Sequence, residues 1–311
     1  MAIKGVNMAS ILGEVIGSRF KDVVFRYTRR DAILYALAIG VSTKQSDYMR
    51  FLHEAERNFT VFPTFALTPA TTVVRDAILT GNFNTLSVDP SKLVLGEQYL
   101  EVFKPMTPSG KILSRGYVAE VLDKGSSGVV IATNVDTFDQ DSGAKLAFGQ
   151  SVFFVRQPIQ SGFKRSSEKI YAVTEAPNGI PHATIQEATS VDQAALYRLA
   201  GHRDQNPLHI DPKFAQHAGY PSPLMHGVCL AGIAARHVLV AFCKNDVGRF
   251  RSIKVRFTSP VYPGDILRSD MWHLNPFRIH LQTTNLATGR VCISGYTDLH
   301  DHDKQNSNAK I

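Results

Sequence analysis

Two stretches of the chain, about 160 residues apart, carry the same pattern of apolar positions. Residues 30–40 end at Gly40 and residues 193–201 end at Gly201, and their apolar positions match at an offset of 162 residues. The matching pairs are Ala32 and Ala194, Leu34 and Leu196, Tyr35 and Tyr197, Leu37 and Leu199, and Ala38 and Ala200. Apolar side chains at this spacing, closed by a glycine, predict two related short helices. The apolar positions of residues 11–24 predict a further helix before the first of them.

β-Rich runs separated by turn residues follow each of the two repeated helices. In the first half the runs are Gln98–Phe103, Gly116–Leu122, Gly128–Thr137 and Ala147–Arg156. In the second half they are Arg251–Thr258, Asp265–His273, Phe277–Asn285 and Gly289–Leu299. Runs of about ten residues that return through short turns predict an antiparallel meander in each half.

The two halves agree a second time near the start of these meanders. The features Phe103, Gly110 and Ile112-Leu113 recur as Phe257, Gly264 and Ile266-Leu267, at an offset of 154 residues. Two matches in the same order predict a duplicated unit of about 150 residues. One central helix and four long strands in each unit favour an α+β double hot-dog fold, in which a curved antiparallel sheet wraps an apolar helix. A generic pair of α+β domains is the alternative.

Composition changes at the join of the two units. Residues 160–167 are polar and contain a glycine, and a turn-like Pro-Asn-Gly-Ile-Pro run follows at residues 177–181. We therefore expect one hot-dog unit over residues 1–160, a linker over 161–181 and a second unit over 182–299. Residues 300–311 are polar and are expected to form a mobile tail.

Overall composition is that of an ordinary globular protein. Of the 311 residues 44% are hydrophobic and 20% are charged. There is no apolar run of about 18 residues, so no membrane span is expected, and the N-terminus lacks the apolar core of a secretory signal. Cys229, Cys243 and Cys292 have no metal-site spacing and are interpreted as reduced, mostly buried thiols.

The net charge of +7 is spread along the chain. It suits a polyanionic ligand, although a solvated basic surface explains it equally well. A nucleic-acid partner is not expected, because there is neither a basic stripe with interleaved aromatic residues nor a nucleic-acid-binding motif.

The second repeated helix leads into a polar loop with an acid and an imidazole. Its sequence is His202-Arg203-Asp204-Gln205-Asn206-Pro207-Leu208-His209. Pro207 fixes its own φ and favours an extended Asn206, so Asp204 and His209 can be held rigidly facing one point. A carboxylate and an imidazole so placed suit proton transfer to and from a water molecule. The alternative is that Asp204 caps the next helix and His209 is a surface histidine.

This loop resembles the motif of the (R)-specific 2-enoyl-CoA hydratases, the MaoC-like hydratase 2 family, in the form found in peroxisomal multifunctional enzyme type 2. The matching residues are Leu199-Ala200-Gly201, Asp204 to His209, Ala215, and Pro223-Leu224-Met225-His226-Gly227. One departure is that His202 and Arg203 separate Gly201 from Asp204, where the family has glycine directly before the aspartate.

The resemblance implies roles for particular residues. Asp204 and His209 would activate the water, Asn206 would help to fix it, and the Gly227 amide would donate to the thioester oxygen. His226 is expected only to pack or to orient the turn. The residues expected to contact the substrate are Leu95, Gly96, Lys124, Gln205, Pro207, Leu208 and Phe257. Leu95 is a departure, because the family usually has histidine there.

The first half lacks the acid–base pair. The helix offset places Ser42 and Asp47 opposite Asp204 and His209. We therefore expect this half to accommodate the acyl chain, with residues 59–66 as a candidate lining; ordinary core packing of that segment is the alternative.

No metal and no cofactor are expected. The spacing of the set His209, Asp211, His217 and His226 matches no standard metal site. The glycines Gly125 and Gly128 flank a turn and do not belong to a phosphate-binding motif.

The function that the resemblance implies is reversible hydration of trans-2-enoyl-CoA to (3R)-3-hydroxyacyl-CoA in peroxisomal β-oxidation. Ala309-Lys310-Ile311 resembles a variant peroxisomal import tripeptide, so an import receptor is an expected partner, and a homodimer is possible. The alternatives are a hot-dog acyl-CoA thioesterase and a non-catalytic acyl-CoA-binding protein.

Overall fold

The computed structural model of the chain describes residues 15–79, 92–157, 169–200 and 204–301. Within them an antiparallel sheet of ten strands runs in the order β1-β3-β4-β5-β2-β7-β10-β9-β8-β6. The first five strands are β1 (Val23–Tyr27), β2 (Leu93–Val102), β3 (Gly110–Asp123), β4 (Val129–Asp139) and β5 (Lys145–Val155). The other five are β6 (Ala183–Ala188), β7 (Phe250–Phe257), β8 (Ile266–Asn275), β9 (Arg278–Asn285) and β10 (Arg290–Leu299).

The strand order is the same when it is followed inward from either edge of the sheet. From one edge it is β1, β3, β4, β5, β2, and from the other it is β6, β8, β9, β10, β7. The halves join where β2 pairs antiparallel with β7, from Glu97 opposite Arg256 to Glu101 opposite Ser252. This equal order agrees with the duplication that the sequence predicts, and the double hot-dog fold is confirmed.

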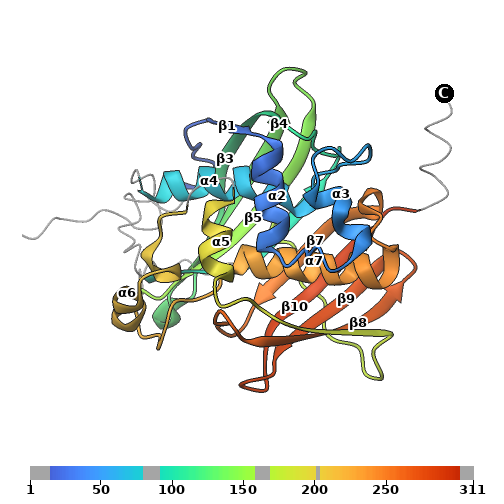
Figure 1. The fold of residues 1–311 in the computed structure, drawn as a ribbon. Helices are drawn as coiled ribbons and strands as arrows, with labels where there is room; N and C mark the ends of the chain where they lie inside the picture. The colour runs from blue at the N-terminus through green and yellow to red at the C-terminus, as the bar shows by residue number, and fades with distance from the viewer. Residues whose placement is uncertain (1–14, 80–91, 158–168, 201–203, 302–311) are drawn as a thin grey trace, which may run out of the picture.

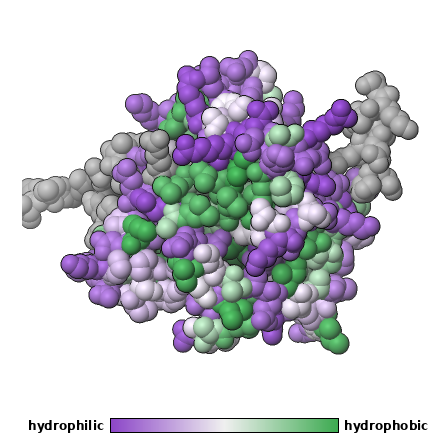
Figure 2. Space-filling model, in the orientation of Figure 1, coloured by the Kyte–Doolittle hydropathy of each residue, from purple (hydrophilic) through white to green (hydrophobic). Residues whose placement is uncertain are grey.

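Helices cover one face of this sheet (Figure 1). They are α2 (Arg29–Ala38), α3 (Met49–Leu52), α4 (Leu67–Leu79), α5 (Gln193–Leu199), α6 (Pro212–His217) and α7 (Gly227–Cys243). α4 packs against β3, β4 and β5, and α7 packs against β7, β9 and β10. On this face apolar residues gather around α2 within a polar surround (Figure 2). The partly buried Leu34 of α2 packs against the core there.

The central helix of each half is not the one that the repeat predicts. α4 and α7 lie on the strands, whereas α2 and α5 pack against each other, with the rings of Tyr35 and Tyr197 5.9 Å apart. The physical reason is that α7 is apolar all round and almost wholly buried, so its periodicity gives no amphipathic signal. Gly232 lets α7 approach α2, because a Cβ at Gly232 would lie 2.5 Å from Ile39.

The eight strands that the sequence predicts are present, and β1 and β6 are two further ones. Of the helix predicted over residues 11–24, Val15 is helical, but residues 18–22 are not and Val23 begins a strand, so the predicted helix is too long; residues 1–14 lie outside the described residues. In β1 the buried Phe25 and Tyr27 alternate with exposed residues, which is the period of a strand. β6 is an edge strand with no buried residue, and its apolar signal is correspondingly weak.

The aromatic segment over residues 59–66 is part of the common core. Phe62 and Phe65 are 2% and 0% exposed, and Tyr35 donates a 2.9 Å hydrogen bond to Thr64. Ordinary core packing therefore accounts for these side chains. The three cysteines are buried and unpaired by disulfides, as the sequence predicts.

The segment between the halves crosses the face of the sheet opposite the helices. Tyr171 stacks on Tyr99 with ring centroids 3.9 Å apart. Thr174 hydrogen-bonds to His280 at 2.7 Å, and Trp272 donates to the carbonyl of Gly179 at 3.1 Å. Residues 169–181 of the predicted linker are thus packed on the sheet, and its first residues lie outside the described ranges. Among the described residues, no helix is both long and apolar enough to cross a membrane.

A buried ionic network closes the two halves on each other. Arg236 of α7 donates to the Ile39 carbonyl at the end of α2, at 2.8 Å, and pairs with Glu187 of β6. His237 lies 3.1 Å from Glu187 and hydrogen-bonds to Ser269 at 2.8 Å. Burial raises the pKa of Glu187, but the hydrogen bond from His237 and the charge of Arg236 outweigh it and lower the pKa to about 2. The carboxylate therefore stays ionised beside a buried guanidinium.

Removal of this guanidinium will destabilise the fold. We expect Arg236→Met to lower the free energy of unfolding by about 3 kcal/mol, because it leaves Glu187 as a largely buried charge without its cation. Urea unfolding followed by circular dichroism measures the change. The matched control is Arg115→Met, since Arg115 pairs with Asp22 on the surface, where about half of each side chain is exposed. The control is expected to cost less than about 1 kcal/mol. Equal costs for the two variants would contradict a structural role for the buried pair.

Candidate active site

The loop after α5 is held by its own side chains. The Asp204 carboxylate accepts a 2.9 Å hydrogen bond from the backbone N–H of Asn206, and the Asn206 side chain accepts from the N–H of Leu208 at 3.1 Å. Asn206 is extended, with φ −61° and ψ 113°, and Pro207 begins the 3-10 turn Pro207–His209. The local backbone is therefore the one that the Asn-Pro pair predicts. Residues 201–203, with the predicted insertion, lie outside the described residues.

His209 is oriented by a backbone carbonyl. Its Nδ1 lies 2.9 Å from the carbonyl oxygen of Leu224, in the segment that leads to α7. This contact fixes the tautomer, because a carbonyl oxygen can only accept a hydrogen bond. In the neutral ring Nδ1 therefore carries the proton, and Nε2 keeps a lone pair with which it can accept another.

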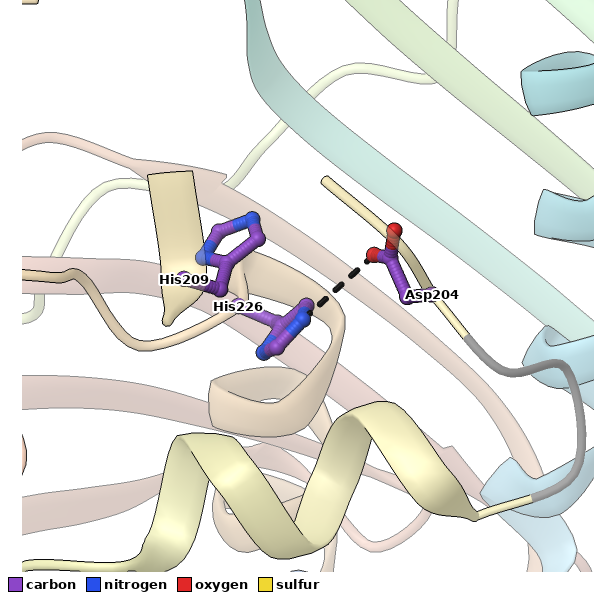
Figure 3. A group of neighbouring side chains, drawn as sticks. All are labelled: Asp204, His209 and His226. Carbon is purple, nitrogen blue, oxygen red and sulfur yellow. Dashed lines mark ion pairs between the residues drawn. The ribbon is translucent and has the colours of Figure 1, made fainter. Parts of the chain in front are cut away.

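His226 lies between the acid and the other imidazole (Figure 3). Its Nε2 is 3.4 Å from Oδ2 of Asp204, and its ring stacks on that of His209 with centroids 3.7 Å apart. The residue is 2% exposed and caps the N-terminus of α7. Its other neighbour is the ring of Tyr197 in α5, at 4.9 Å. Three residues from two segments of the second half thus form one compact group.

Burial and mutual contact set the charge states of this group. Burial raises the pKa of Asp204, but the hydrogen bond from His226 and the Asn206 amide outweigh it and lower that pKa well below its ordinary value. Burial, together with the neighbouring His226, lowers the pKa of His209 to about 3. At neutral pH Asp204 is therefore a carboxylate and His209 is a neutral imidazole, so both are proton acceptors.

The same three residues have the donor types of a metal site. Their ligand atoms lie within 4.8 Å of one another. The rings of His209 and His226 are nearly parallel, however, with 23° between their planes. An imidazole binds a metal in the plane of its ring, so two stacked rings direct their lone pairs side by side rather than at one ion. The arrangement observed suits proton transfer better than metal coordination.

Gly227 opens α7 next to this group. The first N–H groups of a helix have no partner within the helix and carry its positive end. A Cβ at Gly227 would lie 3.1 Å from the ring of Phe257, which ends β7, so glycine leaves room for that ring. Phe257 is half-buried and adjoins Gly227.

The other predicted substrate contacts are more scattered. Leu95 and Gly96 lie in β2, where the pairing with β5 shifts register, and Lys124 is an exposed residue in the turn after β3. Of the loop residues, Gln205 is exposed, whereas Pro207 and Leu208 are half-buried. Among the described residues, no hydrogen bond or ion pair joins the three first-half positions to the group around Asp204.

A cavity of about 520 Å³ lies elsewhere, on the sheet of the first half. Its lining includes Tyr117, Asn134, Phe148 and Lys169, and none of the predicted site residues.

His226 is the member of the group that the sequence prediction undervalued. It stands one residue before Gly227 in the motif, and nothing in the local pattern showed that its ring would reach Asp204. The available signal was its place at the start of a buried helix, where a polar side chain needs a partner.

Two family profiles match the chain in succession. The MFE-2 hydratase 2 N-terminal domain matches residues 25–157, and the MaoC like domain matches residues 172–294. The peroxisomal multifunctional enzyme type 2 of Mus musculus is 43% identical over 289 residues, which cover 91% of this chain and 38% of that protein. A probable enoyl-CoA hydratase 2 of Dictyostelium discoideum is 35% identical and is matched over 93% of its length, by 90% of this chain.

A solved structure shares the fold. The full-length peroxisomal multifunctional enzyme type 2 from Drosophila melanogaster superimposes with a TM-score of 0.78 at 40% identity, over 91% of this chain and 48% of that one. The chain thus spans less than half of the multifunctional enzymes that it matches, and almost all of the shorter Dictyostelium protein.

The charge state of His209 can be tested directly. We expect its ring ¹⁵N signals to show a neutral, Nδ1-protonated imidazole that does not titrate between about pH 5 and pH 8, because burial opposes the imidazolium form. NMR of histidine-labelled protein measures this, with His209→Asn to assign the signal. In urea the same residue should titrate near its ordinary value of 6.5. A folded-state midpoint near that value would contradict the assignment.

Proposed function

Because this chain belongs to the hydratase 2 family of MaoC-like proteins, we propose that it catalyses the reversible hydration of trans-2-enoyl-CoA to (3R)-3-hydroxyacyl-CoA. The observation that carries the proposal is the buried group of Asp204, His209 and His226 beside the N-terminus of α7. It places two proton acceptors next to backbone donors that suit a developing oxyanion.

The proposed reaction uses these parts in order. Water adds its oxygen to C3 of the enoyl thioester, and negative charge develops on the thioester oxygen as an enolate. The Gly227 amide at the start of α7 donates to that oxygen, and one such donor typically contributes about 10²–10³ in rate. Asp204 and His209 share the removal of a proton from the water and its return to C2. Since both begin as acceptors, the proton that reaches C2 is one taken from the water, so the addition balances as H and OH.

Other residues hold or contact the substrate in this proposal. Asn206 supports the loop, because its side-chain oxygen already accepts from Leu208. Phe257 would border the thioester beside Gly227, with Gln205, Pro207 and Leu208 on the loop side. Leu95, Gly96 and Lys124 remain candidates for the CoA end of the ligand, where an exposed lysine suits a phosphate.

The division of labour between the halves is part of the proposal. The unit over residues 1–160 would accommodate the acyl chain, and the unit over residues 182–299 would carry the chemistry, joined through residues 161–181. The first half has Ser42 and Asp47 where the second has its acid–base pair. Long acyl chains need apolar space, which a half without buried catalytic charges can supply.

The cellular setting follows the family. We propose that the reaction belongs to peroxisomal fatty acid β-oxidation; the relatives from Mus musculus and Drosophila melanogaster are named as peroxisomal enzymes. Ala309, Lys310 and Ile311 lie outside the described residues and stay a prediction of an import signal. Pairing of two copies through their sheets stays a prediction as well.

Product analysis separates the proposal from its rivals. Purified protein added to trans-2-decenoyl-CoA is expected to remove the conjugated-thioester absorbance and to give a product oxidised by a (3R)-specific, but not a (3S)-specific, hydroxyacyl-CoA dehydrogenase. Release of free CoA, read with a thiol reagent, would assign the chain to the thioesterases instead. Binding of the enoyl-CoA without turnover would favour the non-catalytic alternative.

Two substitutions test the acid–base pair. Asp204→Asn and His209→Ala are each expected to lower kcat by at least about 10²-fold, because each removes a positioned proton acceptor. Binding of the thioester, measured by calorimetry, should change little.

The chain offers matched controls for both changes. Asp211→Asn removes the same charge from a residue that caps α6 through the N–H groups of Lys213 and Phe214, and His217 is an exposed histidine of α6. Asp211→Asn and His217→Ala should therefore keep nearly full turnover. Unchanged turnover in both test variants would contradict the assignment of Asp204 and His209 as the acid–base pair.

A further inference from the structure

The reaction as proposed assigns no role to His226, the third residue of the group around Asp204. His226 is fully buried, and the nearest polar contact of its ring is the long one of 3.4 Å from Nε2 to Oδ2 of Asp204; Nδ1 has no hydrogen-bond partner among the described residues. Buried polar groups without a function in packing or binding are rare, because each costs free energy to desolvate. The position of this ring therefore needs a reason.

Its surroundings leave few groups for it to act on. From the loop after α5 Asp204 faces one edge of the ring, and from the 3-10 turn His209 covers one of its planes. Tyr197 of α5 lies beside it, at 4.9 Å. These are the titratable groups that the structure places in contact with His226, and two of them are the proposed proton acceptors.

The backbone of His226 is fixed independently of its ring. The residue is the N-cap of α7, with φ −67° and ψ 133°, and its carbonyl accepts from the N–H of Leu230 at 3.1 Å. The ring therefore stands on the buried end of a 17-residue helix, whereas the loop that carries Asp204 is bound mainly by local contacts. Because the helix is the more rigid of the two elements, the contact with His226 fixes the position of Asp204.

The contact also has an electrostatic consequence. Burial alone raises the pKa of Asp204, and the hydrogen bond from His226 is the largest of the opposing contributions. The neighbouring His226 also lowers the pKa of His209 and so disfavours its imidazolium form. One ring thereby favours the ionised form of the acid and the neutral form of the imidazole.

We propose that His226 is a positioning residue of the hydration reaction, whose ring clamps Asp204 by its Nε2–H and His209 by stacking so that both face the same water. The proposal rests on the proposed function. His226 itself does not touch the substrate in this arrangement. It acts through Asp204 and His209, and it links them through a single peptide bond to the Gly227 amide.

Two substitutions separate the hydrogen bond from the stacked ring. His226→Phe keeps a flat ring over His209 but has no donor for Asp204. His226→Gln keeps an N–H close to the position of Nε2 but removes the ring. We expect kcat of the Phe variant to fall by about 10²-fold and that of the Gln variant by about tenfold, with KM changed less than threefold in both. Melting temperatures show that each variant is folded before it is compared.

The pH profile is the readout that a merely structural role would not move. Without the hydrogen bond from His226, the largest contribution that opposes burial is lost, so the pKa of Asp204 rises. Protonation then removes the acceptor as the pH falls, so kcat/KM of the Phe variant should fall at a higher pH than kcat/KM of the wild type. The wild-type and Gln profiles should stay flat over the same range. Superimposable profiles for wild type and Phe variant would overturn the proposal.

A double-substitution cycle tests the role of His226 even if the Phe variant does not fold. If the ring of His226 acts through His209, then His226→Gln in the His209→Ala background should change kcat by less than twofold, against about tenfold in the wild-type background. Equal factors in the two backgrounds would overturn the role. An inactive wild-type protein would overturn the proposed function and this role with it, whereas an active wild type with insensitive His226 variants would overturn only the role.

Discussion

Complete burial of helix α7 is the constraint on which the rest of the structure depends. Apart from Arg236 and His237 its buried residues are apolar, so the helix must be covered by sheet on one side and by α2 on the other. Arg236 and His237 lie within that buried helix, and an unpaired charge there would cost several kcal/mol. Their partners come from the end of α2, from β6 and from β8. The helix can therefore be buried only when both halves of the chain have closed around it.

The duplication explains why the fold is symmetric while the chemistry is not. Each half brings a helix onto its sheet after an irregular segment, and the two segments differ in what they present. Before α4 the first half has Phe65 and Ala66, which fill the core. Where α7 begins, the second half has His226, which carries a polar ring, and Gly227, which has no side chain. The segment that leads to the central helix thus fills the core in the first half and carries part of a cluster of titratable groups in the second.

Local signals in the sequence account for what was predicted correctly. The eight inner strands are long and β-rich, and the Asn206-Pro207 pair fixes its own turn, so neither depends on distant contacts. What was predicted wrongly depends on tertiary context. α7 has no amphipathic period because it has no exposed face, and β6 has almost no apolar face because it is an edge. His226 belongs to the site because α7 begins beside the Asp204 loop. No spacing along the chain reveals that contact.

The start of α7 also explains why an acid and an imidazole can both act as proton acceptors at one place. A carboxylate and a neutral imidazole together carry one negative charge, and the positive end of a helix favours that state over the protonated one. Burial opposes the imidazolium form of His209, and the contact with His226 keeps Asp204 ionised despite burial. The same helix end favours negative charge that develops beside the Gly227 amide. The acceptors of the proton and the donors to the oxyanion are therefore set by one feature of the fold, which is why they occur together at the end of the buried helix.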